Sequence, residues 1–143
     1  MNGHRVVVRG AEQPMAVLGD ERRLGQVTRN LMSNAAKFSP ADSEIQVSLG
    51  VSADRRSAIV QVHDAGPGIP PSERGRLFQK FARLSTAGGT RGSGLGLFIS
   101  RGIVHDHGGE LWADWPPGGG SVFSFRVPLM GDERRTSPRT VTP

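Results

Sequence analysis

Apolar residues recur at helical spacing in the segment that follows Asp20. The carboxylate of Asp20 can accept hydrogen bonds from the free N–H groups of a first helical turn, and helices commonly stop at a sequence such as Ser39-Pro40. The pattern predicts a helix from Asp20 to about Phe38, with an apolar stripe that consists of Leu24, Val27, Leu31, Met32 and Ala35.

Other parts of the chain have the alternating or β-branched pattern of strands. Four such segments follow the first helix, namely residues 44–51, 58–63, 110–115 and 121–129. They form two consecutive pairs, and the short segments 53–56 and 116–120 join their members, which favours antiparallel pairing. At the start of the chain, the apolar runs 5–9 and 16–18 predict a hairpin-like pair of strands.

Two further segments are helical in pattern. Residues 72–82 predict one or two short helices, and residues 95–107 predict a helix that Gly108 and Gly109 end. Between them, the glycine- and threonine-rich segment 84–94 is expected to be a mobile loop.

Helices interspersed with tightly connected strands predict an α+β fold. We expect a two-layer α/β sandwich, with a mixed sheet of about five strands covered by about three helices. Residues 1–130 are the length of one ordinary domain. The polar, proline-containing segment 131–143 is expected to be a disordered tail.

The composition excludes several classes of function. There are no cysteines, so disulfides, thiol catalysis and cysteine-ligated zinc are ruled out. No apolar run is long enough for a membrane span, and the start of the chain lacks the apolar core of a signal peptide, so we expect a cytoplasmic chain without direct membrane contact. The net charge of +5 comes mostly from scattered arginines that no aromatic series accompanies, so we expect no nucleic-acid partner.

The first candidate for chemistry is a set of polar residues on the predicted helix 20–38. Asn30 and Asn34 lie one turn apart, and Lys37 follows one turn later, so the three can project toward one place. An amide oxygen can ligate Mg²⁺, and the lysine ammonium can contact phosphate oxygens. The alternative is an ordinary solvated helix face.

The second candidate is the sequence from Asp64 to Ile69, at the end of a predicted strand. Gly66 and Gly68 allow positive φ and close approach of a ligand to the main chain. A carboxylate accepts hydrogen bonds only, which suits the exocyclic amine of adenine and disfavours the carbonyl of guanine. The alternative is a β-turn that begins with aspartate.

The third candidate is the glycine series Gly92-x-Gly94-x-Gly96, which leads into a predicted helix. Free N–H groups and the helix dipole at such a place can receive phosphate. The spacing differs from the dinucleotide pattern G-x-G-x-x-G, and the upstream segment is a polar loop rather than a strand. The P-loop sequence is also absent.

Together these segments resemble the catalytic ATP-binding domain of bacterial sensor histidine kinases. The resemblance covers about residues 15–129. It rests on an N box at 23–40, glycine boxes at 64–70 and 92–97, an F box at 77–83, and closing segments at 107–109 and 118–123. It implies the Bergerat-type sandwich shared with gyrase, chaperone and MutL ATPases.

The resemblance also implies a role for each candidate residue. Asn34 would ligate Mg²⁺, Asp64 would recognise adenine, and Asn30, Lys37 and Arg83 would act in catalysis. The segment 84–91 would close over the phosphates, and Ala82 departs from the aromatic residue of many relatives. The implied ATP contacts are Asn34, Lys37, Asp64, Gly66, Gly68, Ile69, Phe81, Arg83, Gly92, Ser93, Gly94, Leu95, Gly96, Leu97 and Ser121.

Asn30 indicates which ATP chemistry to expect. Relatives that hydrolyse ATP carry a glutamate general base at this position, four residues before the asparagine that ligates Mg²⁺. An amide cannot deprotonate water near neutral pH. Phosphoryl transfer to an acceptor that is itself a nucleophile needs mainly positioning and charge stabilisation. We therefore expect a kinase rather than an ATPase.

The acceptor histidine is expected on a different domain. None of His4, His63, His105 and His107 has the sequence context of a phosphorylated histidine, and His105 and His107 favour a core or cap role over metal binding. The expected partners are a histidine-bearing dimerisation domain of the same kinase and then a response regulator. The isolated domain is expected to be a monomer that does not phosphorylate itself.

Two alternatives stay open from the sequence. One is a serine kinase of the anti-sigma-factor type, which shares the fold and is naturally short. The other is a nucleotide-binding module without transfer activity.

Overall fold

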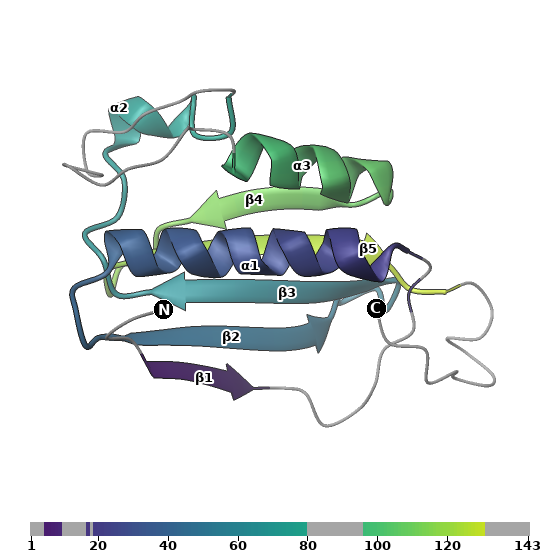
Figure 1. The fold of residues 1–143 in the computed structure, drawn as a ribbon, viewed down its shortest axis with the longest axis horizontal. Coiled ribbons are helices and arrows are strands. Elements are labelled where there is room, and N and C mark those ends of the chain that lie inside the picture. The colour runs from purple at the N-terminus through teal and green to yellow at the C-terminus, as the bar shows by residue number, and fades with distance from the viewer. Residues whose placement is uncertain (1–4, 10–16, 18, 80–95, 131–143) are drawn as a thin grey trace.

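The sheet and two of its helices form two layers. The computed structural model describes residues 5–9, 17, 19–79 and 96–130. Its five strands have the order β1-β2-β3-β5-β4, and α1 and α3 lie side by side on one face of the sheet (Figure 1). The elements are β1 (Arg5–Arg9), α1 (Glu21–Phe38), β2 (Glu44–Val51), β3 (Ser57–Asp64), α2 (Pro71–Arg74), α3 (Gly96–Asp106), β4 (Glu110–Asp114) and β5 (Ser121–Pro128). The α+β sandwich with a mixed sheet is therefore confirmed.

The predicted hairpin at the start of the chain is wrong. β1 pairs in parallel with β2, from Arg5 opposite Glu44 to Arg9 opposite Ser48. Val17 instead forms an isolated antiparallel bridge with Leu129. β-branched runs favour strand geometry but do not select the partner strand, and here β1 and Val17 each pair with a segment that is remote in sequence. The pairs β2–β3 and β4–β5 are antiparallel, as their tight turns predict. β3 also pairs antiparallel with β5, which is remote in sequence.

The first helix follows its sequence signals closely. Asp20 is the N-cap, and its carboxylate accepts from the N–H groups of Arg22 and Arg23 at 3.0 and 3.2 Å. At the other end, the N–H of Ser39 donates to the carbonyl of Ala35. The apolar stripe is buried in a core shared with the inner face of the sheet, formed by Leu24, Val27, Leu31, Ala35, Ile45, Val62, Phe123 and Phe125, among others.

The predicted helical segment 72–82 is mostly not a helix in the described residues. α2 is a single turn with Pro71 at its first position, and residues 75–79 continue as turns and a bend. Gly75 has low helix propensity, and no side chain of α2 is buried to stabilise a longer helix. Residues 80–82 lie outside the described part of the chain, as do the segments 84–94 and 131–143 that were expected to be mobile or disordered.

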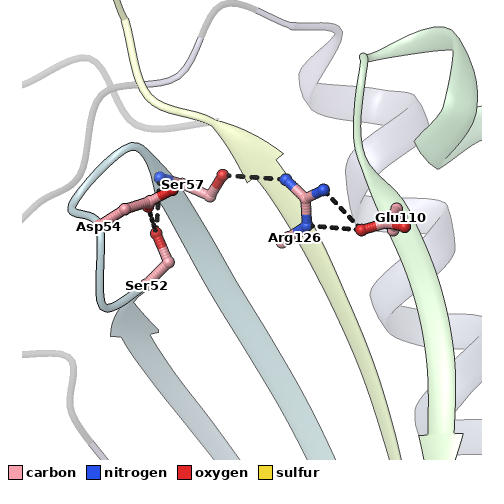
Figure 2. A network of polar contacts seen from close by, with 5 residues as sticks. All are labelled: Ser52, Asp54, Ser57, Glu110 and Arg126. Carbon is pink, nitrogen blue, oxygen red and sulfur yellow. Dashed lines mark hydrogen bonds and ion pairs between the residues drawn. The ribbon is translucent and has the colours of Figure 1, made fainter.

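A network of polar contacts connects β3, β4 and β5 at one end of the sheet (Figure 2). Arg126 on β5 donates to the carboxylate of Glu110 on β4 and to the hydroxyl of Ser57 on β3. The Ser57 N–H donates to the hydroxyl of Ser52, which in turn donates to Asp54 at 2.6 Å. Hydrogen bonds from Ser52 and from the backbone of Arg56 lower the pKa of Asp54. This network lies at the start of β3, at the opposite end of that strand from Asp64.

His107 connects α1 with α3, which is the cap role of the two roles, core or cap, that the sequence predicts for it. His105, for which the same was predicted, is exposed. The Nε2 of His107 accepts from the N–H of Asp20 at 3.0 Å, so the hydrogen lies on Nδ1, which donates to the carbonyl of Ile103 at 2.8 Å. Arg23 and Asp106 add an exposed ion pair between the same two helices.

Replacing His107 with Ala is expected to lower the free energy of unfolding by about 1 to 2 kcal/mol, because two hydrogen bonds and the packing against Gly19 are lost. Urea denaturation measures this. His105→Ala is the matched control, since that side chain is exposed in the last turn of α3, two residues before His107, and it is expected to change the value by less than about 0.5 kcal/mol. Equal effects of the two substitutions would show that His107 does not connect the helices.

Candidate functional site

Asp64 is the last residue of β3, and only one of the two oxygens of its buried carboxylate has a hydrogen-bond partner among the described residues. The residue is 1% exposed. Its Oδ1 accepts from the N–H of Gly66 at 2.8 Å, whereas its Oδ2 is buried without a hydrogen-bond partner among the described residues. A buried acceptor without a partner is costly and uncommon in folded proteins. Oδ2 is therefore available to a donor from a ligand.

Burial raises the pKa of Asp64 above its ordinary value. The N–H groups of Gly66 and Ser121 and the nearby His63 oppose this effect but do not cancel it. The ionised carboxylate is thus destabilised in the free protein. A ligand that donates a hydrogen bond to Oδ2 would stabilise it.

The segment after Asp64 is held close to the turn that precedes β5. Gly66 and Gly68 are buried, and Gly68 has a φ of +81°. A Cβ on Gly68 would lie 3.3 Å from Cδ1 of Trp115 and 3.5 Å from the carbonyl oxygen of Gly120. The side chain of Ile69 is 3% exposed and belongs to the core. The predicted residues Gly66, Gly68 and Ile69 are therefore all buried in the segment that follows Asp64.

Gly120 and Trp115 line the same place, although no candidate drawn from the sequence included them. A Cβ on Gly120 would lie 2.0 Å from the carbonyl oxygen of Asp64, and its φ is +82°. Ser121, which was a candidate, pairs with Asp64 across the sheet and is 2% exposed. The run of three glycines at 118–120 was the available signal, but the sequence could not show which of them contacts Asp64.

On α1, Asn30 is bound to the start of α3. Its Nδ2 donates to the hydroxyl of Ser100 at 3.0 Å, and it is 3.4 Å from the carbonyl oxygen of Gly96. Ser100 is fully buried. A glutamate could not donate to the Gly96 carbonyl, so the amide at this position favours the contact with α3. One turn later along α1, Asn34 is partly buried and Lys37 is exposed.

The third group of candidates is only partly within the described residues. Gly96 is the exposed first residue of α3, and Leu97 packs partly buried against the core. Phe81, Arg83, Gly92, Ser93, Gly94 and Leu95 lie outside the described residues, as does Ala82.

The elements that contain the described candidates come together at one side of the molecule. Figure 1 shows that α1 and β3 both end on the left, that α2 lies above these ends, and that α3 begins on the side toward α2.

Among the described residues, no group of three or more His, Cys, Asp or Glu side chains could hold a metal ion. The helices of the described part of the chain also lack the length and the apolar character that a membrane span requires.

Comparisons with known proteins agree on one family. Residues 19–131 match the family described as histidine kinase-, DNA gyrase B-, and HSP90-like ATPase. The adaptive-response sensory kinase SasA of Prochlorococcus marinus is 40% identical over 129 residues, which are 88% of this chain and 33% of that protein. The signal transduction histidine-protein kinase/phosphatase MprB of Mycolicibacterium vanbaalenii is 44% identical over 110 residues, or 76% of this chain and 22% of that protein. The chain thus spans a third or less of the length of these relatives.

The solved structures that this chain resembles include those of sensor histidine kinases. The mycobacterial sensor histidine kinase MprB superimposes with a TM-score of 0.77 at 36% identity, over 88% of this chain and 82% of that one. Full-length ShkA, solved in complex with AMPPNP, gives a TM-score of 0.77 at 27% identity, over 97% of this chain and 27% of that one.

Proposed function

This chain belongs to the family of histidine kinase-, DNA gyrase B- and HSP90-like ATPases, and from that premise we propose that it is the ATP-binding catalytic domain of a sensor histidine kinase in two-component signal transduction. The observation that carries the proposal is the buried Oδ2 of Asp64, which has no hydrogen-bond partner among the described residues. The named sensor kinases among its relatives support it.

Adenine is the base that this carboxylate favours. The exocyclic amine of adenine would donate to Oδ2, while Oδ1 keeps its bond from the Gly66 N–H. Guanine would place a carbonyl oxygen at the same edge and leave two acceptors facing each other. The close packing of Gly66, Gly68, Ile69 and Ser121 around Asp64 fits a flat ring bound beside the main chain.

Mg²⁺ fits the residues of α1 as a partner of the nucleotide. The Asn34 amide oxygen is a hard donor of the kind that Mg²⁺ accepts, and Mg²⁺ usually combines one or two protein ligands with phosphate oxygens and water. In the described residues no carboxylate and histidine cluster could hold the ion by itself. We propose that Asn34 holds it together with the phosphates, and that it neutralises phosphate charge when bound.

The other candidates are proposed to bind the phosphates. Lys37 is exposed one turn beyond Asn34 and can reach them as a cation. The N–H groups of the first turn of α3, which begins with Gly96 and Leu97, are a further candidate, because α3 begins on the side of the molecule toward α2 (Figure 1). Phe81, Arg83, Gly92, Ser93, Gly94 and Leu95 are proposed as further contacts by the family pattern.

The chemistry proposed is transfer of the γ-phosphoryl group to a histidine. A ring nitrogen of the acceptor attacks the γ-phosphorus, the bond to the β-phosphate oxygen breaks, ADP leaves, and the proton on the other ring nitrogen is released to solvent. No general base is needed, because a neutral imidazole nitrogen has its own lone pair. The Asn30 amide agrees with this, since it holds the start of α3 and cannot deprotonate water. The acceptor would belong to a dimerisation domain of the same cytoplasmic kinase, which would then pass the phosphoryl group to a response regulator.

We expect phosphorylation only when the acceptor is supplied. The chain, Mg²⁺ and γ-labelled ATP would be mixed with a separately produced histidine-bearing helical domain of a related sensor kinase. Acid-labile, alkali-stable label on that domain is the expected result, and the chain alone stays unlabelled.

Controls separate this function from its alternatives. A helical domain with the histidine replaced by Ala, and the chain variant Asp64→Asn, should both give no label. Acid-stable label on a serine would favour the serine kinase, whereas ATP binding without transfer to any of several cognate helical domains would favour the nucleotide-binding module.

A further inference from the structure

Arg74 and Trp115 form a stacked pair beside the proposed nucleotide site. The guanidinium carbon of Arg74 lies 4.1 Å from the centroid of the Trp115 ring. Arg74 ends α2, and Trp115 follows the last residue of β4, so the pair joins two segments that are 41 positions apart in the sequence. A planar guanidinium stacks well on an indole face, and lysine cannot reproduce that geometry.

Both members of the pair contact the segment that follows Asp64. Arg74 Nε donates to the carbonyl of Ile69 at 2.8 Å. The Cδ1 edge of Trp115 faces Gly68, at 3.3 Å from the position that a Cβ would occupy. The segment from Gly66 to Ile69 is therefore held by a hydrogen bond at its end and by an aromatic edge in its middle.

Trp115 keeps its place through packing and stacking. Its indole nitrogen is buried without a hydrogen-bond partner among the described residues, and the ring packs against the core. No hydrogen bond among the described residues orients the indole, and the guanidinium of Arg74 stacks on its ring. Loss of Arg74 would free both the ring and the Ile69 carbonyl.

We propose that the Arg74–Trp115 pair positions the Gly66–Ile69 segment for nucleotide binding, an inference that rests on the proposed function. The pair acts through Gly68 and Ile69, which fix the direction of the main chain directly after Asp64. Arg74 and Trp115 are thus positioning residues for the adenine site.

The experiment measures the dissociation constant of Mg-ATP by titration calorimetry for the wild-type chain and four variants. Arg74→Ala is expected to weaken ATP binding about five- to tenfold, because the stack and the hydrogen bond are both lost. Arg74→Lys should give an intermediate value, and Trp115→Ser should resemble Arg74→Ala. Trp112→Phe is the matched control, since Trp112 lies on β4, three residues before Trp115, with its indole bonded to Asp114, and this variant should bind ATP as the wild type does.

A spectroscopic measurement separates positioning from a general loss of structure. The chain has two tryptophans, so the Trp112→Phe variant reports Trp115 alone. In that background, Arg74→Ala should shift the emission of Trp115 to longer wavelength while the far-ultraviolet circular dichroism is unchanged.

The outcomes distinguish this inference from the proposed function. If the wild type does not bind ATP, the proposed function fails and the inference fails with it. If the wild type binds ATP and Arg74→Ala binds equally well, only the inference is overturned. If Arg74→Ala loses structure, the Arg74→Lys variant decides. An affinity for ATP between those of Arg74→Ala and the wild type supports positioning by the pair. An affinity equal to that of the wild type overturns the role of the planar stack.

Discussion

Replacing Asp64 with Asn is expected to abolish ATP binding, with an affinity loss of about a hundredfold or more. The variant exchanges the free acceptor Oδ2 for an amide donor, which would face the donating amine of adenine. Shape and volume hardly change, so the effect reports the loss of the acceptor and of the carboxylate charge rather than a change in packing. Titration calorimetry with Mg-ATP measures it.

Asp54→Asn is the matched control for this substitution. Asp54 has a carboxylate with hydrogen bonds from its own turn and lies at the opposite end of β3. Its replacement should leave ATP affinity unchanged. Unchanged affinity in Asp64→Asn itself would falsify the assignment of adenine to this carboxylate.

The Asp64→Asn substitution is also expected to change how the free energy of unfolding depends on pH. The pKa of Asp64 is raised in the folded chain by burial, above the ordinary value of 3.8 that the unfolded chain keeps. Between these two values the folded chain binds a proton that the unfolded chain has released, so stability falls as pH rises through that window. The free energy of unfolding of the wild type, minus that of Asp64→Asn, should therefore decrease above pH 3.8 and then level off. A difference that grows with pH would contradict the burial of this carboxylate.

Replacing Gly120 with Ala is the second substitution for which we expect a large effect. The new Cβ would lie 2.0 Å from the carbonyl oxygen of Asp64, and the φ of +82° is unfavourable for any residue with a side chain. The main chain of Asp64 or of Gly120 must move. A loss of about 3 kcal/mol in the free energy of unfolding is expected, and ATP binding should weaken as well, because Asp64 is displaced.

Gly118 provides the control within the same turn. A Cβ there meets nothing within 4 Å, and Gly118 is not among the glycines with positive φ. Gly118→Ala should change stability by less than about 0.5 kcal/mol and leave ATP affinity intact. Urea denaturation compares the two variants, and similar losses in both would mean that the contact with Asp64 is not the cause.

The glycines at 118–120 also show what a sequence pattern cannot predict. The three glycines at 118–120 look alike in the sequence, yet of the three only Gly120 lies against Asp64. Likewise, Asn30 was correctly placed on the helix with Asn34, but its hydrogen bond to Ser100 spans 70 positions. A residue type and its spacing indicate which element it occupies, and they contain no information about a neighbour brought there by another element.

By itself, the sequence determined α1 with its caps, strands β2 to β5 to within a residue or two, the helix that begins near Gly96, and the place of Asp64 at the end of its strand. Periodicity, capping and turn chemistry act over a few residues, so a local pattern is enough to specify them. Only the tertiary structure decided that β1 pairs in parallel with β2 and that α2 is a single turn. It alone brought Gly120 against Asp64 and Arg74 against Trp115, because strand partners and close contacts are selected by burial and register across the whole fold.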